Sequence, residues 1–400
     1  MRLNRRFVVP VLLLTLLLTG SLTGLAGNAP PDLPEKLTDQ EFWTLTETIS
    51  EPNGVFQSDN LLSNEIVFAR MVPDLVASTK PGGVYLGVGP EQNFTYIAAI
   101  RPKMAFITDI RRGNLHMHLM YKALFELSKD RAEFVSRLFT KPRPGGLEAG
   151  SSVADIMNAY WEVATSDEAT YNANLAAIHA QLTTTHRLPL SADDLAGIAR
   201  VYRTFYWYGP AMTYSANTAL ALPLPGAGRG TTYRDLMTQS DANGQGLSYL
   251  GSEEKFLFLK DLERRNLVVP VVGDFTGPKA LRAVGAYIRD HGATVTAFYL
   301  SNVEQYLRRA NTWQAFCSNV ATFPLDDASL FIRPSGSNFV FVNGQLASGA
   351  TGQPVVVTGG TTTAAGRLAE IRLAVGAPTG ASAFAGGLVS IASEVKNCGG

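Results

Sequence analysis

Two glycines and one acid form the chemically most suggestive pattern in this sequence. Gly87 and Gly89 follow a short apolar run, residues 84–86, and Asp109 closes a second apolar run. A helical pattern over residues 91–100 separates the two runs. Glycines let a backbone approach a ligand at the positive end of a helix, and an acid about 20 residues later accepts from ribose hydroxyls in nucleotide-binding folds. The pattern therefore predicts a βαβ unit with a nucleotide-like ligand at the carboxyl ends of its strands.

The same pattern also has a purely structural interpretation. The third glycine position of the full G-x-G-x-x-G fingerprint holds Gln92. A doubly wound sheet can use such glycines only for a tight turn, with Asp109 capping the next segment. Both interpretations give the same fold class, α/β with a Rossmann-like, doubly wound and mostly parallel sheet, because strands that are apolar throughout are typical of sheets covered on both faces.

Further polar residues are expected at the same edge of the sheet. The strand predicted over residues 267–272 ends just before Asp274, and the strand over residues 293–300 ends just before Glu304. Because ligands bind outside the carboxyl ends of such strands, Asp274 and Glu304 are candidate catalytic residues. A polar stretch, residues 56–65, either folds as an arm over the glycine turn or supplies a helix N-cap. The candidate ligand-binding residues are Gly87, Gly89, Glu91, Asp109, Asn64 and Glu65.

The acids in this set suggest a second kind of chemistry. If Glu65, Glu91, Asp109, Asp274 and Glu304 crowd one cleft, they would raise one another's pKa for acid/base work or hold a divalent cation. That arrangement would suit a hydrolase or lyase acting on an envelope substrate. No metal site is predicted, since the sequence has no H-E-x-x-H and no C-x-x-C motif. It also has no G-x-S-x-G motif, which favours an exported, non-catalytic binding or scaffold protein as a third interpretation.

The composition is that of an ordered globular protein. The 34 basic residues balance the 34 acidic ones, which argues against a dedicated nucleic-acid binder. Residues 1–27 combine three early arginines, a short apolar run and small residues, which is typical of a secretory signal peptide. We therefore expect an exported protein, periplasmic or secreted, with an uncleaved membrane anchor as the alternative. Cys317 and Cys398 would then share an oxidising compartment, and whether they pair is left open.

The sequence predicts a chain of four parts. Residues 1–27 are the signal peptide, and residues 28–37 are a proline-rich linker. Residues 38–325 form the α/β domain, with a large helical insertion at about residues 115–245. Residues 326–400 hold a C-terminal hairpin, made by residues 330–333 and 339–342, and a weakly packed tail rich in Gly, Ala and Thr.

Three stretches, within roughly residues 37–320, carry a resemblance to a known group of proteins. They read SEPNGVFQSDN, YLGVGPEQNFTYIAAIRPKMAFITDIRR and VVGDFTGPKALRAVGAYIRDHGATVTAFYLSNVEQYL. The chain resembles a group of uncharacterised bacterial proteins with a class I S-adenosylmethionine-dependent methyltransferase-like fold.

The resemblance implies a cofactor and a reaction. S-adenosylmethionine would bind through Gly87, Gly89 and Asp109, and Asp274 would lie near the transferred methyl group. Methyltransferases usually carry an acid two residues before the first glycine, where this sequence has Tyr85. The cofactor is made in the cytosol, whereas an export signal is predicted here. The function expected first is a methyltransferase-like protein of unknown substrate that binds a small molecule and no nucleic acid. It would contact a membrane only through an uncleaved signal segment.

Overall fold

The computed structural model describes residues 31–56, 58–65, 67–214, 231–333, 340–342, 345–347 and 387–398. The predicted signal peptide, residues 1–27, lies outside the described residues, as does most of the predicted Gly/Ala/Thr-rich tail. Among the described helices, none combines the length and the apolar character needed to cross a membrane.

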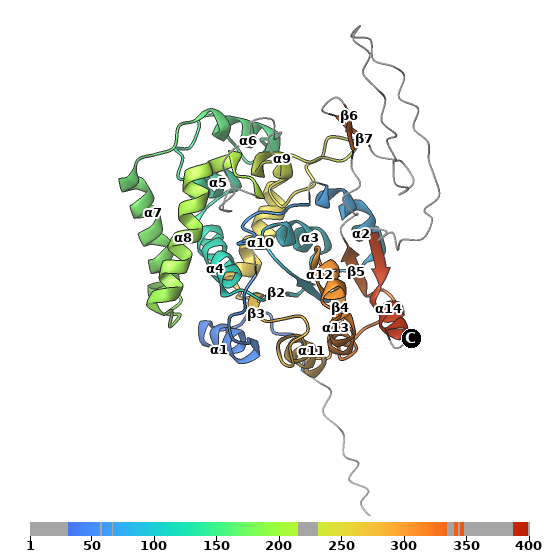
Figure 1. Cartoon of the computed structure of the whole chain (residues 1–400). Coiled ribbons are helices and arrows are strands. Elements are labelled where there is room, and N and C mark those ends of the chain that lie inside the picture. Colours follow the sequence, from blue (N-terminus) through green and yellow to red (C-terminus); the bar gives the residue numbers. More distant parts are fainter. Residues whose placement is uncertain are drawn as a thin grey trace, which may run out of the picture.

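A six-stranded sheet forms the centre of the protein (Figure 1). Its strands are β1 (Val84–Gly87), β2 (Met104–Asp109), β3 (Val268–Val272), β4 (Val295–Tyr299), β5 (Leu330–Arg333) and β8 (Gly387–Ser390). Their order across the sheet is β3-β2-β1-β4-β5-β8, with β1 to β5 parallel and β8 antiparallel to β5. Every residue of β1, β2 and β3 is buried, as expected when helices cover both faces. The predicted α/β class with a mostly parallel sheet is confirmed.

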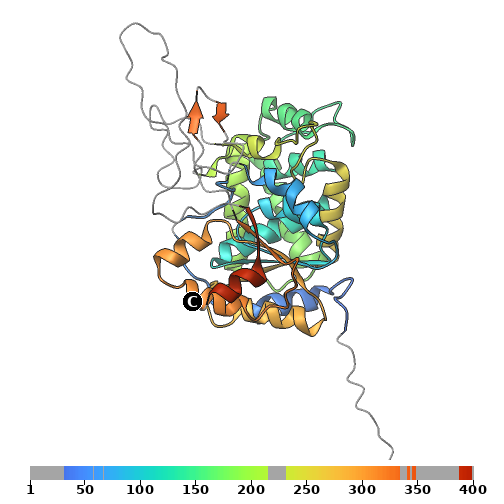
Figure 2. The same ribbon diagram turned by 90° about the vertical axis from the view of Figure 1, so that its right-hand side faces the viewer.

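Helices cover the two faces of the sheet (Figures 1 and 2). One face carries α2 (Val72–Ser78), α3 (Gln92–Ile100), α4 (Arg112–Leu127) and α10 (Glu253–Arg264). The other carries α1 (Asp39–Ile49), α11 (Ala280–Asp290), α13 (Trp313–Val320) and α14 (Ile391–Asn397). The carboxyl ends of the parallel strands are left open between these layers.

A large helical region separates β2 from β3 in the chain. Beyond α4 it contains α5 (Arg131–Phe139), α6 (Val153–Glu162), α7 (Glu168–Ala180), α8 (Ala192–Tyr208) and α9 (Tyr233–Met237). Shorter turns of helix cover Phe68–Met71, Gln181–Thr185 and Gly209–Ala211, and α12 (Val303–Arg309) follows β4. Helix α8 packs against α4, α5 and α7, which places the region beside the sheet, in green in Figure 1.

A buried ion-pair network attaches this helical region to the rest of the protein. The Nε2 atom of His186 lies 2.5 Å from Glu126 Oε2 in α4, and its Nδ1 atom lies 2.6 Å from Asp39 Oδ1 in α1. Burial is the largest single influence on the pKa of His186 and lowers it, but the hydrogen bonds to Glu126 and Asp39 and the charge of Glu126 together raise it above its usual value. Burial raises the pKa of Glu126, but His186 and Lys122 together lower it by more than burial raises it, and the resulting pKa is about 2. The network therefore stabilises a charged imidazolium between carboxylates.

The first described segment does not behave as the predicted linker. Leu33 and Leu37 are buried, and the Leu37 amide donates to the Arg265 carbonyl oxygen at 3.0 Å. The prediction of a linker is therefore wrong for residues 31–37, because their leucines pack on the domain. Helix α1 follows directly, and Thr38 forms a capping box with Glu41 at its start.

The C-terminal part corrects a second prediction and answers an open question. The run 330–333 was expected to form a hairpin with residues 339–342, but as β5 it pairs with β4 and β8. The second run contributes β6 (Val340–Val342), which pairs with β7 (Gln345–Ala347) in a separate ribbon. The central sheet therefore extends past residue 325. Cys317 and Cys398 form a disulfide that joins α13 to the end of α14.

Candidate functional site

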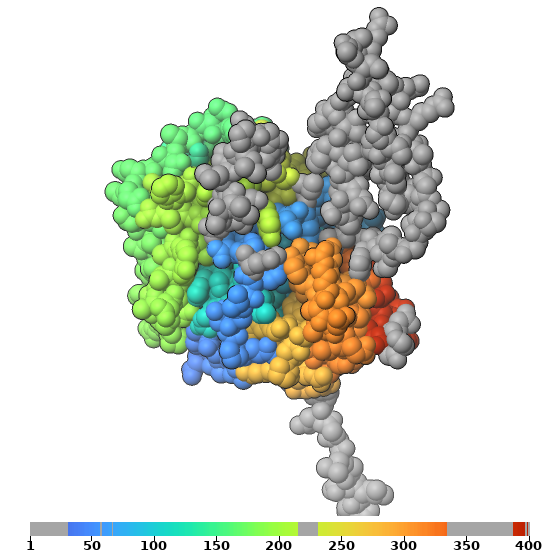
Figure 3. All heavy atoms as spheres, in the orientation of Figure 1, coloured from blue at the N-terminus to red at the C-terminus, as the bar shows by residue number. Residues whose placement is uncertain are grey.

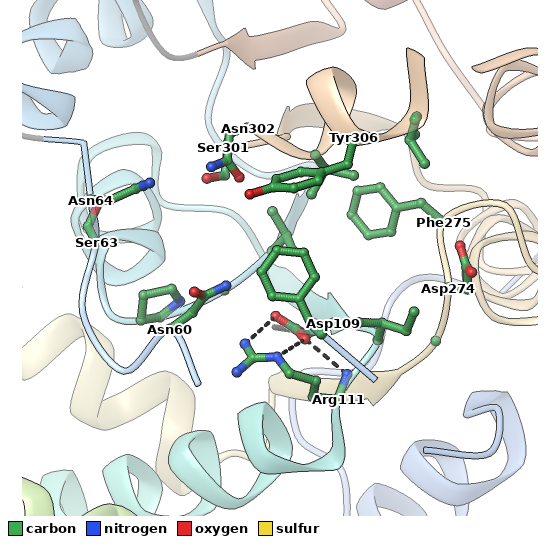
Figure 4. A pocket seen from close by; sticks show the side chains of 18 of the residues that line it. Asn60, Ser63, Asn64, Asp109, Arg111, Asp274, Phe275, Ser301, Asn302 and Tyr306 are labelled. Atoms are coloured by element: carbon green, nitrogen blue, oxygen red, sulfur yellow. Dashed lines mark hydrogen bonds and ion pairs between the residues drawn. The ribbon is translucent and has the colours of Figure 1, made fainter. Parts of the chain in front are cut away.

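A cleft lies at the carboxyl ends of β1 to β4, where the strand order reverses between β1 and β4. This reversal is the position at which doubly wound sheets bind ligands. The cleft has a volume of about 290 Å³. Its floor and walls include Val88, Gly89, Pro90, Gln92, Asp109, Arg111, Asp274, Phe275, Ser301, Asn302, Val303 and Tyr306 (Figure 4).

The glycine turn after β1 is held by side chains rather than by backbone alone. Gly89 lines the cleft and has a φ of 79°, which favours glycine. The Asn93 side-chain amide donates to the three backbone carbonyls of residues 88–90, at 2.9, 3.2 and 2.7 Å. The Tyr85 hydroxyl in turn donates to Asn93 Oδ1 at 2.8 Å. Gly87 lies behind the turn, where an added Cβ would come within 1.9 Å of Asn93 Oδ1.

Asp109 reaches the cleft as predicted, but it is bound by a neighbour. Its Oδ1 accepts from the backbone N–H and the Nε of Arg111, at 2.9 and 3.1 Å, and its Oδ2 accepts from Nη2 at 3.1 Å (Figure 4). The Nη1 of Arg111 donates to the carbonyl oxygens of Ser58 and Asp59. Arg111 thus ties the strand end to the segment 56–65. Each carboxylate oxygen can accept about two hydrogen bonds, so Oδ2 retains capacity for a ligand hydroxyl.

The segment 56–65, which we call the arm, forms the outer wall of the cleft. Phe56, Asn60, Leu62, Ser63 and Asn64 line the cleft. Figure 3 shows the arm in blue at the surface, between the helical region in green and residues near 300 in orange. The segment lies at the cleft as the arm interpretation expected, but of its two candidate ligand-binding residues Asn64 is in the lining and Glu65 is not.

The other predicted acids separate into those at the cleft and those away from it. Asp274 lines the cleft, and its Oδ1 accepts from the backbone N–H and the hydroxyl of Thr276, both at 2.8 Å. Glu304 is outside the lining and is buried between Arg308 and Arg333, with both contacts at 2.8 Å. The predicted place of Glu304 on the rim is therefore wrong, because α12 turns this side chain towards β5.

Two further acids lie behind the lining. Glu91 is fully buried beneath the turn, where burial raises its pKa to about 8 despite backbone hydrogen bonds from Glu91 and Ser63 that lower it. Burial raises the pKa of Glu65 to about 7, although hydrogen bonds from Ser301 and Tyr299 lower it. The five acids therefore do not crowd one cleft, as only Asp109 and Asp274 line it. The described residues contain no group of His, Cys, Asp and Glu side chains arranged to hold a metal ion.

Most residues of this cleft lie within a match to a known protein family. A family described as a domain of unknown function (DUF7790) matches residues 61–193 and 227–356. The chain belongs to this family. A search of curated proteins finds no match. The matched ranges contain the glycine turn, Asp109, Asp274 and Ser301, whereas Phe56 and Asn60 of the arm precede them. Most of the cleft therefore lies within the DUF7790 domain.

Sequence reasoning missed several residues that shape the site in this DUF7790 protein. Arg111 carried a signal, since it follows Asp109 by two residues at the end of a predicted strand. Phe275 carried a signal as well, since it follows directly after Asp274. Its ring stacks on that of Phe316, with the ring centroids 5.7 Å apart. Ser301 carried no sequence signal, because its place in the site depends on a backbone conformation that no short motif in the sequence indicates.

Proposed function

We propose that the cleft binds S-adenosylmethionine or a closely related adenine nucleoside, and that the protein is a methyltransferase-like α/β protein of the class I type. The observation that carries this proposal is the convergence of Gly89, Asp109 and Asp274 on one cleft at the reversal of the strand order. Brought there by three different strands, these residues are placed to contact different parts of one nucleoside.

The lining fits the parts of such a ligand. Asp109 Oδ2 retains room for a ribose hydroxyl, while Phe275 offers an aromatic surface beside Asp274 for a purine base. Gln92 Oε1 is buried with no hydrogen-bond partner among the described residues, and its residue lines the cleft. Since buried polar atoms are normally paired, a ligand donor would satisfy it. Asn64 and Gly89 would then face the amino-acid end.

The chemistry divides between ligand and protein. S-adenosylmethionine supplies an electrophilic methyl group when it is bound. The protein would contribute mainly position, because in-line transfer depends on holding donor and acceptor in one geometry. The apolar side chains Leu62 and Val303 line the cleft and would keep water from the reacting groups.

The disulfide supports export as a further part of the proposal. Cys317 and Cys398 are paired, and such bonds persist in oxidising compartments. We therefore propose that residues 1–27 direct the chain out of the cytosol. A nucleoside-binding protein outside the cytosol could serve for binding alone, so the absence of methyl transfer in the presence of tight binding would favour the non-catalytic alternative.

Isothermal titration of the full chain with S-adenosylmethionine and S-adenosylhomocysteine tests the proposal. We expect micromolar binding that Asn64→Ala weakens about fivefold, the effect of losing one hydrogen bond worth about 1 kcal/mol. Asn158→Ala is the matched control, because Asn158 is an exposed asparagine on α6 outside the cleft lining. The proposal fails if neither ligand at millimolar concentration gives heat or a shift in melting temperature.

A further inference from the structure

Ser301 occupies an unusual backbone position at the edge of the cleft. It lies between the end of β4 at Tyr299 and the start of α12 at Val303, and the Val303 amide donates to the Leu300 carbonyl at 3.1 Å. The φ of Ser301 is 49°, in the left-handed region that residues with a side chain rarely adopt. Strain of this kind gathers at functional sites, and a serine at a sharp strand-to-helix turn is the arrangement that exposes nucleophilic serines in α/β hydrolases.

A carboxylate lies directly behind this serine. The Ser301 hydroxyl donates to Glu65 Oε1 at 2.7 Å, while Ser301 itself lines the cleft (Figure 4). A serine hydroxyl is a weak nucleophile alone and is activated by an adjacent base within hydrogen-bond reach. The arm supplies Glu65 and the sheet supplies Ser301, so folding brings together two residues that are far apart in sequence.

The surroundings of Glu65 set the pH at which it can accept a proton. The groups that face it are Tyr85 of β1, Tyr96 of α3 and Tyr299 of β4, together with Ser301. Burial raises the pKa of all three tyrosines above its ordinary value, so these neighbours stay neutral. With its own pKa raised to about 7, Glu65 is a stronger base than an exposed carboxylate.

We infer that Ser301 and Glu65 form a nucleophile–base pair that cleaves uncharged carboxylic esters bound in the cleft. This activity goes beyond the proposed function, since it needs no methyl donor. Ser301 Oγ bonds to the acyl carbon while Glu65 takes the hydroxyl proton, and the C–O bond to the alcohol then breaks as the alcohol recovers that proton. Water releases the acid from Ser301 in the second half of the reaction, with Glu65 again passing the proton.

The cleft lining indicates the substrate class. The Asn302 side chain lines the cleft next to Ser301 and is of the type that stabilises a developing oxyanion. Leu62 and Val303 supply apolar surface to the lining. Arg111 is the one basic side chain among the described lining residues, and it is paired with Asp109, so the site favours an uncharged ester over an anionic one.

Ser191 provides a matched control within the same chain. Its hydroxyl donates to Asp194 Oδ2 at 2.8 Å, a serine–carboxylate contact almost as short as that of Ser301. Ser191, however, is an N-cap residue with an ordinary φ of −71°. Burial raises the pKa of Asp194, but hydrogen bonds from Arg112 and His116 lower it well below its usual range, so it is a poor base. Ser191 is exposed, so accessibility alone would favour its reaction.

Covalent labelling with diisopropyl fluorophosphate tests the inference without knowledge of the natural ester. The reagent forms an Oγ–P bond as its P–F bond breaks, with fluoride leaving and the proton passing to Glu65. We expect peptide mapping of the full chain to place the label on Ser301 and not on Ser191. The rate should rise with pH through about 7, and Glu65→Gln should lower it about 100-fold, the smallest usual contribution of a general base.

Two variants keep the result interpretable. Ser301→Gly removes the hydroxyl and suits the left-handed backbone, so it should stay folded and take no label. Ser301→Ala should also take no label. The inference is overturned if the folded wild-type chain takes no label, if Ser191 reacts as fast as Ser301, or if Glu65→Gln leaves the rate and its pH dependence unchanged.

Discussion

The Asp109–Arg111 pair offers the sharpest test of how the cleft is held together. The two side chains are 6% and 9% exposed, and three hydrogen bonds join them. Arg111→Met would leave Asp109 as a buried carboxylate without its cation. Removing one member of a buried pair typically costs about 3–5 kcal/mol, whereas replacing both members by apolar residues is often close to neutral. We therefore expect Arg111→Met to destabilise the protein by several kcal/mol and Asp109→Leu/Arg111→Met to recover most of that loss.

Urea unfolding of the four members of this double-mutant cycle measures the coupling energy directly. We expect a coupling of about 2–3 kcal/mol that changes little with salt, because buried pairs are poorly screened. The exposed pair Arg203–Glu168, with side chains 39% and 54% exposed, is the matched control. Its coupling should be about 0.2–1 kcal/mol and should fall with added salt.

The same variants separate stability from ligand binding. Because Arg111 also binds the carbonyls of Ser58 and Asp59, Arg111→Met should free the arm and weaken nucleoside binding even at temperatures where the protein stays folded. Additive effects of the two substitutions, or a loss below about 1 kcal/mol for Arg111→Met, would refute the view that the pair is a buried structural tie.

Three further outcomes are expected. The raised pKa of His186 adds stability that is complete below the unfolded pKa of about 6.5 and is lost as pH rises through the folded pKa. The melting-temperature difference between wild type and His186→Gln should therefore shrink from about pH 6 to pH 8. A constant difference would contradict the charged bridge to Glu126. Cys398→Ser should lower the unfolding free energy by about 2–5 kcal/mol in non-reducing buffer, and the same loss should follow reduction of the wild-type bond to Cys317; equal denaturation midpoints would show that the bond adds nothing. Gly87→Ala should destabilise the turn by about 1–3 kcal/mol through overpacking, measured by urea unfolding, and an unchanged midpoint would show that the turn has room for a Cβ.

Local patterns in the sequence were sufficient for the parts of the fold that local forces decide. The βαβ unit that contains β1, α3 and β2 was predicted because its apolar runs and its helical spacing are continuous. The start of α1 is also decided locally, because Thr38 is a strong N-cap residue. Asp109 was placed at the cleft because the carboxyl ends of parallel strands must share one edge, whereas the arm was only one of two interpretations left open for residues 56–65.

The failures have a common physical origin in contacts between distant parts of the chain. Residues 330–333 have the composition of a strand, but their pairing with β4 and β8 depends on which edge of the sheet is free. Glu304 was placed on the rim by its distance from the end of β4, yet one helical turn is enough to direct it to Arg333. The left-handed Ser301 is imposed by the connection from β4 to α12, so the serine itself gives no local signal.

The tyrosine that replaces the usual acid of the glycine motif can be explained in the same terms. Tyr85 points from the strand to Asn93, and Asn93 uses its amide to bind the three carbonyls of the turn. Without the tyrosine hydroxyl, Asn93 Oδ1 would be a buried acceptor with no donor, which costs about 1–3 kcal/mol. Tyr85 therefore fixes the conformation of the turn through a neutral hydrogen bond, and the departure from the acid does not weaken the glycine turn. The Glu65 carboxylate of the arm, by contrast, accepts a hydrogen bond from the Ser301 hydroxyl at the edge of the cleft.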